Sequence, residues 1–335
     1  TIEDKLPVSS RGETNNVHPF VINGRIVCQR FSDVLNHRHQ KQKKMGGTPK
    51  LKKFVIDEKN KSKFAYDGKY IFSSLPDDSF NFWLKKGYFS EKASLIAVNS
   101  YVGKNGVIVD IGAHIGTMSV PFAKMVPKGR VISFEPQKKM YQLLVKNLND
   151  NGIVNCRAFN YAVGHIHGIK VSMNDKPFNM KGELTVKSLD GKTVDYTGWS
   201  LGSMGEEVNM IALDEYLTFP VDLIKVDVEG FEACVFYGAQ QYIKKYKPMI
   251  LFEYTPTIRK ILPSIKKSSK ITKEIEKFDI MKYCESIGYD RVIKIKHNYL
   301  ILCPSHQIKR KDPKFKISKT GKIHKMDLYI MANLY

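Results

Sequence analysis

One stretch decides how the rest of the sequence is interpreted: Val109-Asp110-Ile111-Gly112-Ala113-His114-Ile115-Gly116. An apolar, strand-like run ends in an acid and enters a turn with two glycines four positions apart. Glycine lets the backbone approach a ligand closely, and the start of the following helix offers unpaired N–H groups. Asp110 is an acceptor suited to an ammonium or hydroxyl group. Because the spacing is not G-x-G-x-x-G and no Lys-Ser or Lys-Thr follows, dinucleotide and P-loop functions are disfavoured.

Strand and helix patterns alternate around this turn, which predicts an α/β fold with a parallel sheet and crossover helices. We expect strands at 107–110, 130–135, 154–160, 221–227 and 248–253. We expect helices at 117–126, 138–149, 231–243 and 272–287. Two further strand-like runs, 291–296 and 299–303, are close enough in the chain to form an antiparallel hairpin.

A second acid, Glu135, ends the second expected strand, 25 residues after Asp110. An acid at this place in a doubly wound sheet accepts hydrogen bonds from a ribose diol. Alternatively, Glu135 caps the next helix, since Pro136 stands at a position typical of a first helical residue. The two acids together suit a nucleoside with a cationic amino-acid end, and S-adenosylmethionine fits that description.

A third group of polar residues lies in Ile224-Lys225-Val226-Asp227-Val228-Glu229-Gly230. With strand periodicity Lys225, Asp227 and Glu229 would share a side at the ligand-binding end of the sheet. A lysine in an apolar strand is costly unless it is paired, and we expect Asp227 or Glu229 as its partner. Glu253 ends the next strand at the same edge. Such clusters are used for acid–base catalysis, although a structural ion pair is the alternative.

The composition is that of a globular protein with a strong surplus of basic residues. The chain has 335 residues, 42% of them hydrophobic, and a net charge of +21. These values exclude a wholly disordered or collagen-like chain. The charge would attract polyanions, but only nine of the 54 basic residues are Arg, which also fits a diffuse lysine surface or an AT-rich genome such as that of a virus or parasite.

The cysteines and the hydropathy pattern predict a soluble protein in a reducing compartment, such as the cytoplasm or a viral factory. No run reaches the roughly 18 apolar residues that cross a membrane. The first residues lack the apolar core of a signal peptide. The odd number of cysteines is not spaced as metal ligands, which indicates free thiols: Cys28, Cys156, Cys234, Cys284 and Cys303.

Changes in composition predict four regions. Residues 1–53 form a basic extension, and 54–100 form a cap of short strands and aromatic-rich helices. Residues 101–304 form the α/β core, with a polar insertion at about 166–208. Residues 305–335 form a second basic extension. The oligomeric state cannot be deduced from these patterns.

The combination of motifs resembles the FkbM-type family of S-adenosylmethionine-dependent methyltransferases. The matching pieces occur in family order over about residues 64–304: VDIGAHIG at 109–116, Phe134-Glu135-Pro136, Asn160-Tyr161-Ala162-Val163-Gly164, Ala212–Leu217, DLIKVDVEG at 222–230 and the strand ending at Glu253. His114 stands where the family usually has Asn. The resemblance implies a class I, Rossmann-like fold with a seven-stranded, mostly parallel sheet and an antiparallel C-terminal hairpin.

The resemblance also implies roles for single residues. The turn residues Asp110, Gly112, Ala113, His114 and Gly116 would hold the methionine end of the cofactor, and Glu135 the ribose hydroxyls. Tyr161 and Ala162 would border the adenine, and Asp227 would lie near the transferred methyl group.

Methyl transfer to oxygen needs an aligned acceptor and a base. We assign the base role to Asp227, with Glu229 or Glu253 as alternates, and expect Lys225 or a divalent cation to assist. The family favours a hydroxyl of a sugar, glycan or other small acceptor. The basic ends favour an RNA 2′-hydroxyl instead, and a non-catalytic module that binds nucleic acid or a protein assembly is the third alternative.

Overall fold

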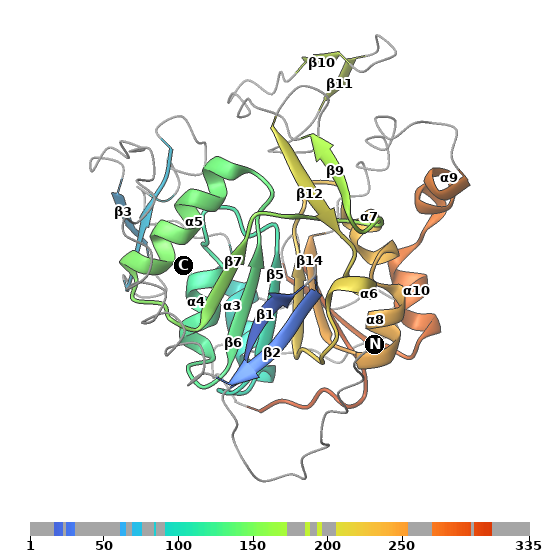
Figure 1. Ribbon diagram of the computed structural model, residues 1–335. Coiled ribbons are helices and arrows are strands. Elements are labelled where there is room, and N and C mark those ends of the chain that lie inside the picture. The colour runs from blue at the N-terminus through green and yellow to red at the C-terminus, as the bar shows by residue number, and fades with distance from the viewer. Residues whose placement is uncertain are drawn as a thin grey trace. The chain divides into compact units, whose positions relative to one another are not determined.

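The computed structural model contains two compact units, Thr1–Phe54 and Val55–Tyr335 (Figure 1). The structure describes residues 17–22, 25–30, 61–64, 69–75, 84, 91–172, 185–187, 193–195, 206–253, 270–295 and 298–309. In the first unit, β1 (Val17–Ile22) pairs antiparallel with β2 (Arg25–Arg30). All other described elements belong to the second unit.

The second unit is built on a seven-stranded sheet with the order β15-β16-β14-β13-β5-β6-β7. The strands are β5 (Val107–Ile111), β6 (Arg130–Phe134), β7 (Cys156–Phe159), β13 (Leu223–Val226), β14 (Met249–Glu253), β15 (Arg291–Ile295) and β16 (Asn298–Leu302). Strands β7, β6, β5, β13 and β14 run parallel, and β16 is antiparallel to both of its neighbours. This topology confirms the expected class I, Rossmann-like fold.

The order of strands reverses between β5 and β13. From β5 the chain continues outward to β6 and β7, and from β13 it continues in the other direction to β14. Their register places Asp110 opposite Lys225 and Ile111 opposite Val226. In open α/β sheets, ligands bind at the carboxyl ends of strands at this switch point. The predicted site residues of both strands therefore meet where the topology places a ligand.

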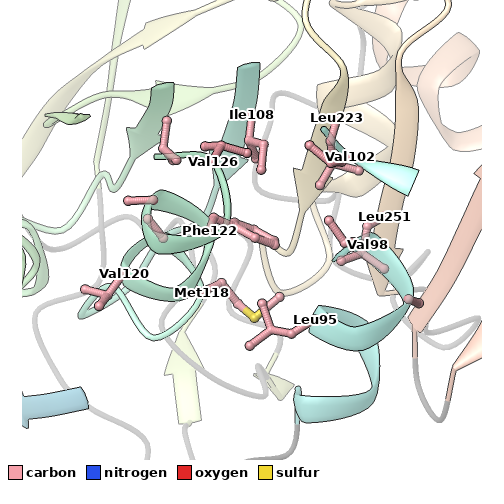
Figure 2. Packing of buried hydrophobic residues seen from close by; sticks show 14 of the residues in the cluster. Leu95, Val98, Val102, Ile108, Met118, Val120, Phe122, Val126, Leu223 and Leu251 are labelled. Carbon is pink, nitrogen blue, oxygen red and sulfur yellow. The ribbon is translucent and has the colours of Figure 1, made fainter. Parts of the chain in front are cut away.

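Helices α3 (Lys92–Tyr101), α4 (Ser119–Met125) and α5 (Lys138–Asp150) form one side of the hydrophobic core. In Figure 2, Leu95 and Val98 of α3 lie beside Met118 and Phe122 near α4. The strands contribute residues of the same cluster from alternate positions, among them Ile108, Leu223 and Leu251. Helix α3 thus packs against α4 and β16 and belongs to the same core.

The opposite face of the sheet carries the short helices α6 (Leu213–Tyr216), α7 (Glu232–Tyr237), α8 (Gln240–Tyr246) and α10 (Ile280–Ser286), with α9 (Lys270–Lys277) packed on α7. Phe236 of α7 contacts Phe252 of β14 edge-on, with ring centroids 5.3 Å apart. We expected one helix at 231–243 and one at 272–287. The structure has the pairs α7–α8 and α9–α10 there, so both predictions were wrong.

Local backbone geometry explains each break. Between α7 and α8, a Cβ on Gly238 would lie only 2.0 Å from the carbonyl oxygen of Gly164, so the chain passes close to another backbone there. Between α9 and α10, the carboxylate of Asp279 accepts hydrogen bonds from the backbone N–H groups of Met281 and Lys282, both at 3.1 Å, and starts a new helix.

Smaller sheets flank the main one. Strand β12 (Glu207–Ile211) lies between β8 (Ala162–Val163) and β9 (Ile169–Ser172), and β10 (Thr185–Lys187) pairs with β11 (Thr193–Asp195). The sequence predicts strand-like pieces at 169–173 and 184–188 in the insertion. These match β9 and β10, but β12 was missed. In the cap, the sequence over 63–72 predicts two short strands joined by an Asp-Gly turn, and β3 (Lys61–Phe64) and β4 (Tyr70–Ser73) form such an antiparallel pair. Its Asp-Gly turn and most of the aromatic segment at 80–89 lie outside the described residues.

The structure also bears on the predicted free cysteines and on the search for membrane-spanning helices. All four cysteines whose side chains are described, Cys156, Cys234, Cys284 and Cys303, are free thiols. None of the described helices combines the length and apolar character that crossing a lipid bilayer requires.

A buried amide connects the cap to the core. The Asn147 side chain has 0% exposure, accepts a hydrogen bond from the Ser73 N–H at 2.8 Å and donates to the carbonyls of Ser73 and Ile115 at 3.0 and 2.8 Å. It therefore ties β4 to the turn that follows β5.

We predict that Asn147→Leu destabilises the protein by about 2–4 kcal/mol, because three buried backbone groups lose their partner. Chemical denaturation measures the free energy of unfolding. Asn149→Leu, an exposed position on the same helix, is the control and should change it by less than about 0.5 kcal/mol. Equal effects of the two substitutions would contradict this role of Asn147.

Candidate functional site

The turn after β5 requires glycine at two positions. Gly112 has φ +74°, and a Cβ there would lie 1.7 Å from the carbonyl oxygen of Asp227. Gly116 has φ +93°, and its Cβ would lie 2.8 Å from Cδ1 of Leu144. The N–H groups of Gly112 and Ala113 both donate to the Phe134 carbonyl at 3.0 Å. The glycines therefore allow the turn to pack against the β13 loop and helix α5.

Lys225 connects this turn to the end of β13. Its Nζ donates to the Gly112 carbonyl at 2.9 Å and forms ion pairs with Asp110 Oδ1 and Asp227 Oδ2, both at 3.3 Å. Burial alone would lower the pKa of Lys225. The negative charges of Asp110 and Asp227 raise it by more than burial lowers it, so the pKa lies above its ordinary value. The expected partner Asp227 is confirmed, Glu229 forms no such pair, and Asp110 was missed as a partner.

Asp110 is completely buried beneath the edge of the sheet. Its Oδ2 accepts a hydrogen bond from Ser119 Oγ at 2.6 Å, and Ser119 in turn lies 2.8 Å from Ser133 Oγ. The carboxylate thus holds Lys225 and the start of α4. A direct contact of Asp110 with a cofactor stays a prediction. The serines were missed, because hydroxyl residues in apolar segments give no distinctive sequence signal.

The loop after β13 has an unusual backbone. Glu229 has φ +50° and Gly230 has φ +104°. The buried Glu232 carboxylate accepts hydrogen bonds from the N–H groups of Val228 at 3.2 Å and Gly230 at 3.1 Å. Because the strand ends at Val226, Glu229 does not follow the alternation that we expected for it. Glu232 was missed, although an acid in the first turn of a helix is a recognisable signal.

Carboxylates gather around Lys225 at this edge. Burial is the main reason that the pKa of Glu229 rises to about 8, and Asp227 and Glu253 raise it further. Burial and Asp227 also raise the pKa of Glu253 to about 7. For Glu232, burial raises the pKa to about 7. These groups are therefore partly protonated near neutral pH, and their protonation depends on one another.

Glu135 is buried at the next strand end. Its Oε2 accepts a hydrogen bond from the His114 N–H at 2.8 Å, and its Oε1 accepts one from the Gln137 N–H at 2.9 Å. Gln137 is the N-cap residue of α5, so Glu135 binds the N–H just before the helix, and Pro136 precedes the cap instead of being the first helical residue that we expected. Each carboxylate oxygen can accept a second bond, and the ribose contact stays a prediction.

The residues expected near adenine lie beyond β7. Tyr161 stacks on Phe159 with ring centroids 6.2 Å apart and meets Tyr216 edge-on at 5.9 Å. Ala162 is buried in β8 and pairs with Met210 of β12. These contacts do not test whether Tyr161 and Ala162 border the adenine, which stays a prediction. Within the described residues, no group of three or more His, Cys, Asp or Glu side chains could hold a metal ion.

Residues 110–285 match the family model described as "Methyltransferase FkbM domain", which is more than half of the chain. No curated protein matches the sequence at a significant level.

Among solved structures, one similar chain is the methyltransferase FkbM from Methylobacillus flagellatus KT, with 18% identity and a TM-score of 0.32 over 45% of this chain and only 33% of the other. An rRNA methylase from Streptococcus thermophilus has 9% identity and a TM-score of 0.34 over 64% and 94%. M. jannaschii TYW2 in complex with AdoMet has 12% identity and a TM-score of 0.28 over 69% and 79%. These TM-scores are too low to support an argument about function.

The raised pKa of Glu229 leads to a prediction about stability. A carboxyl group whose pKa is about 8 in the folded state and 4.5 in its ordinary state favours folding when it is protonated, so its contribution is lost as the pH rises through this window. Glu229→Gln, which cannot ionise, should raise the unfolding temperature at about pH 9 and change it little at about pH 4.5.

Thermal unfolding at both pH values measures this difference. The exposed Glu215→Gln is the matched control and should change neither temperature. An unfolding temperature that Glu229→Gln lowers equally at both pH values would show that the ionised carboxylate is not destabilising.

Proposed function

This chain belongs to the FkbM methyltransferase family, and we propose that it transfers the methyl group of S-adenosylmethionine to a hydroxyl of a neutral, sugar-like acceptor. The observation that supports this most is the meeting of the Gly112 turn and Asp227 at the switch point, joined by Lys225. A turn suited to the methionine end and a carboxylate suited to a base are thus linked through one ammonium group.

The residues present fit S-adenosylmethionine. Glu135 keeps acceptor capacity for ribose hydroxyls, and the edge around Asp227 is rich in carboxylates that favour a sulfonium cation. The Gln137 side chain next to Glu135 is buried, yet neither its Oε1 nor its Nε2 has a hydrogen-bond partner in the described structure. A polar ligand beside α5 would supply the missing partner. When bound, the cofactor supplies an activated methyl group.

Asp227 is the best-placed base. Its side chain is 33% exposed, whereas Asp110 is completely buried. The ion pair with Lys225 fixes one carboxylate oxygen and orients the group. We assign Lys225 to positioning Asp227 and the turn, and keep Glu229 and Glu253 as alternate bases. A base held in this way can accept the proton of an acceptor hydroxyl as the methyl group is transferred.

The charge of the edge favours a neutral acceptor. Four carboxyl groups in addition to Asp110 influence one another there: Asp227, Glu229, Glu232 and Glu253. Most basic residues of the two extensions lie outside the described residues, and Lys225 is neutralised by its two ion pairs. A phosphate-rich acceptor would meet repulsion at this edge. A hydroxyl-rich, uncharged acceptor would instead find hydrogen-bond acceptors.

We predict that S-adenosylhomocysteine binds the wild-type protein and Asp227→Asn with similar affinity, whereas Glu135→Gln weakens binding about tenfold or more, because a donor replaces one acceptor oxygen. Titration calorimetry measures these affinities, with Glu215→Gln as the control. Transfer of a labelled methyl group to a panel of neutral oligosaccharides should require Asp227. Methylation by Asp227→Asn at the wild-type rate would remove Asp227 as the base.

RNA is the competing acceptor, and its test is separate. An RNA acceptor would be methylated by the labelled cofactor, and its binding would weaken steeply with salt because phosphate contacts release counterions. Methylated RNA with no methylated oligosaccharide would overturn the neutral-acceptor proposal. RNA binding without any cofactor binding would indicate the non-catalytic module.

A further inference from the structure

Glu91 lies immediately before α3, outside the matched residues 110–285, and its position is fixed by two other side chains. Its Oε2 accepts hydrogen bonds from Ser94 Oγ at 2.9 Å and from Asn298 Nδ2 at 2.5 Å. Asn298 also donates to Ser94 Oγ at 3.1 Å, so the three residues form a closed network. Asn298 begins β16, and α3 contacts this strand.

The strand register places this network at the functional edge of the sheet. Asn298 is the register partner of Glu253 at the end of β14. One residue earlier, Phe252 is the partner of Val226, and Asp227 follows Val226 directly. The elements α3, β16, β14 and β13 therefore bring Glu91, Asn298, Glu253 and Asp227 to the same edge, although the first two are far from the others in sequence.

Glu91 interacts electrostatically with the groups already assigned to the site. Burial raises its pKa most, Asp227 raises it further, and Lys225 lowers it. Glu91 in turn contributes to the raised pKa of Glu253. The hydrogen bonds from Ser94 and Asn298 both go to Oε2, so the network holds the carboxylate through one of its two oxygen atoms.

We propose that Glu91 is a further positioning residue of the methyl-transfer site, a carboxylate supplied by α3 and β16 that adds negative charge where the sulfonium of S-adenosylmethionine binds. This inference rests on the proposed function, since it needs the cofactor at this edge. Glu91 acts together with Asp227: the sulfonium is attracted by the summed charge of the edge, and the Ser94–Asn298 network keeps Glu91 from turning away.

The test compares two ligands that differ in charge at one atom. S-adenosylmethionine has a positive sulfonium, and S-adenosylhomocysteine has a neutral thioether with the same amino-acid and nucleoside parts. Glu91→Gln should weaken binding of S-adenosylmethionine by roughly three- to tenfold at about pH 8.5 and leave S-adenosylhomocysteine binding within about twofold. Calorimetry with both ligands gives the ratio of affinities. A role in folding alone would lower both affinities equally.

Three controls make the result decisive. The exposed Glu276→Gln on α9 removes the same charge elsewhere and should leave the ratio unchanged. Ser94→Ala keeps the Glu91 charge but removes one hydrogen bond and should change the ratio by less than about twofold. Glu91→Asp retains a carboxylate and should keep most of the preference for S-adenosylmethionine over S-adenosylhomocysteine. This variant provides a result even if Glu91→Gln does not fold.

The outcomes separate this inference from the proposed function. The proposed role of Glu91 is overturned if Glu91→Gln leaves the ratio of the two affinities unchanged, which includes an equal weakening of both. The proposed cofactor site would still stand in that case. If the wild-type protein binds neither ligand, the proposed function itself fails.

Discussion

The arrangement of the site depends on one buried ammonium group. Lys225 Nζ lies within 3.3 Å of two carboxylates and donates to the Gly112 carbonyl, although its side chain is almost excluded from water. A buried charge is tolerated only when it is paired, and removing one partner of such a pair costs about 3–5 kcal/mol. Because its three partners lie at the ends of two adjacent strands, Lys225 holds the Gly112 turn and Asp227, the proposed base, as one unit.

The same geometry explains why a strongly basic chain has an acidic functional edge. The parallel strands and α3 deliver acids from separate parts of the sequence, and burial raises the pKa of several of them, among them Glu91, Glu229 and Glu253. Lys225 neutralises only part of this charge. The net charge of +21 therefore describes the whole chain and not the place where chemistry is proposed to occur.

The sequence predicted the local features of this fold well because glycines and strand-ending acids occur within single motifs. It could not predict contacts that depend on tertiary structure: the Asp110–Lys225 pair forms because β5 and β13 are neighbours, and Glu91 is joined to Asn298 because α3 packs on β16. The two helix breaks also escaped prediction, since the apolar spacing continues across Gly238. Tertiary contacts decided these points.

A crystal structure of the protein with S-adenosylhomocysteine tests the central claim most directly. The account predicts the methionine part at the Gly112–Gly116 turn, the ribose at Glu135, and the thioether sulfur facing Asp227, with Lys225 still bound to the Gly112 carbonyl. A ligand bound at another edge of the sheet, or a Lys225 released from Asp110 and Asp227 in the complex, would contradict it.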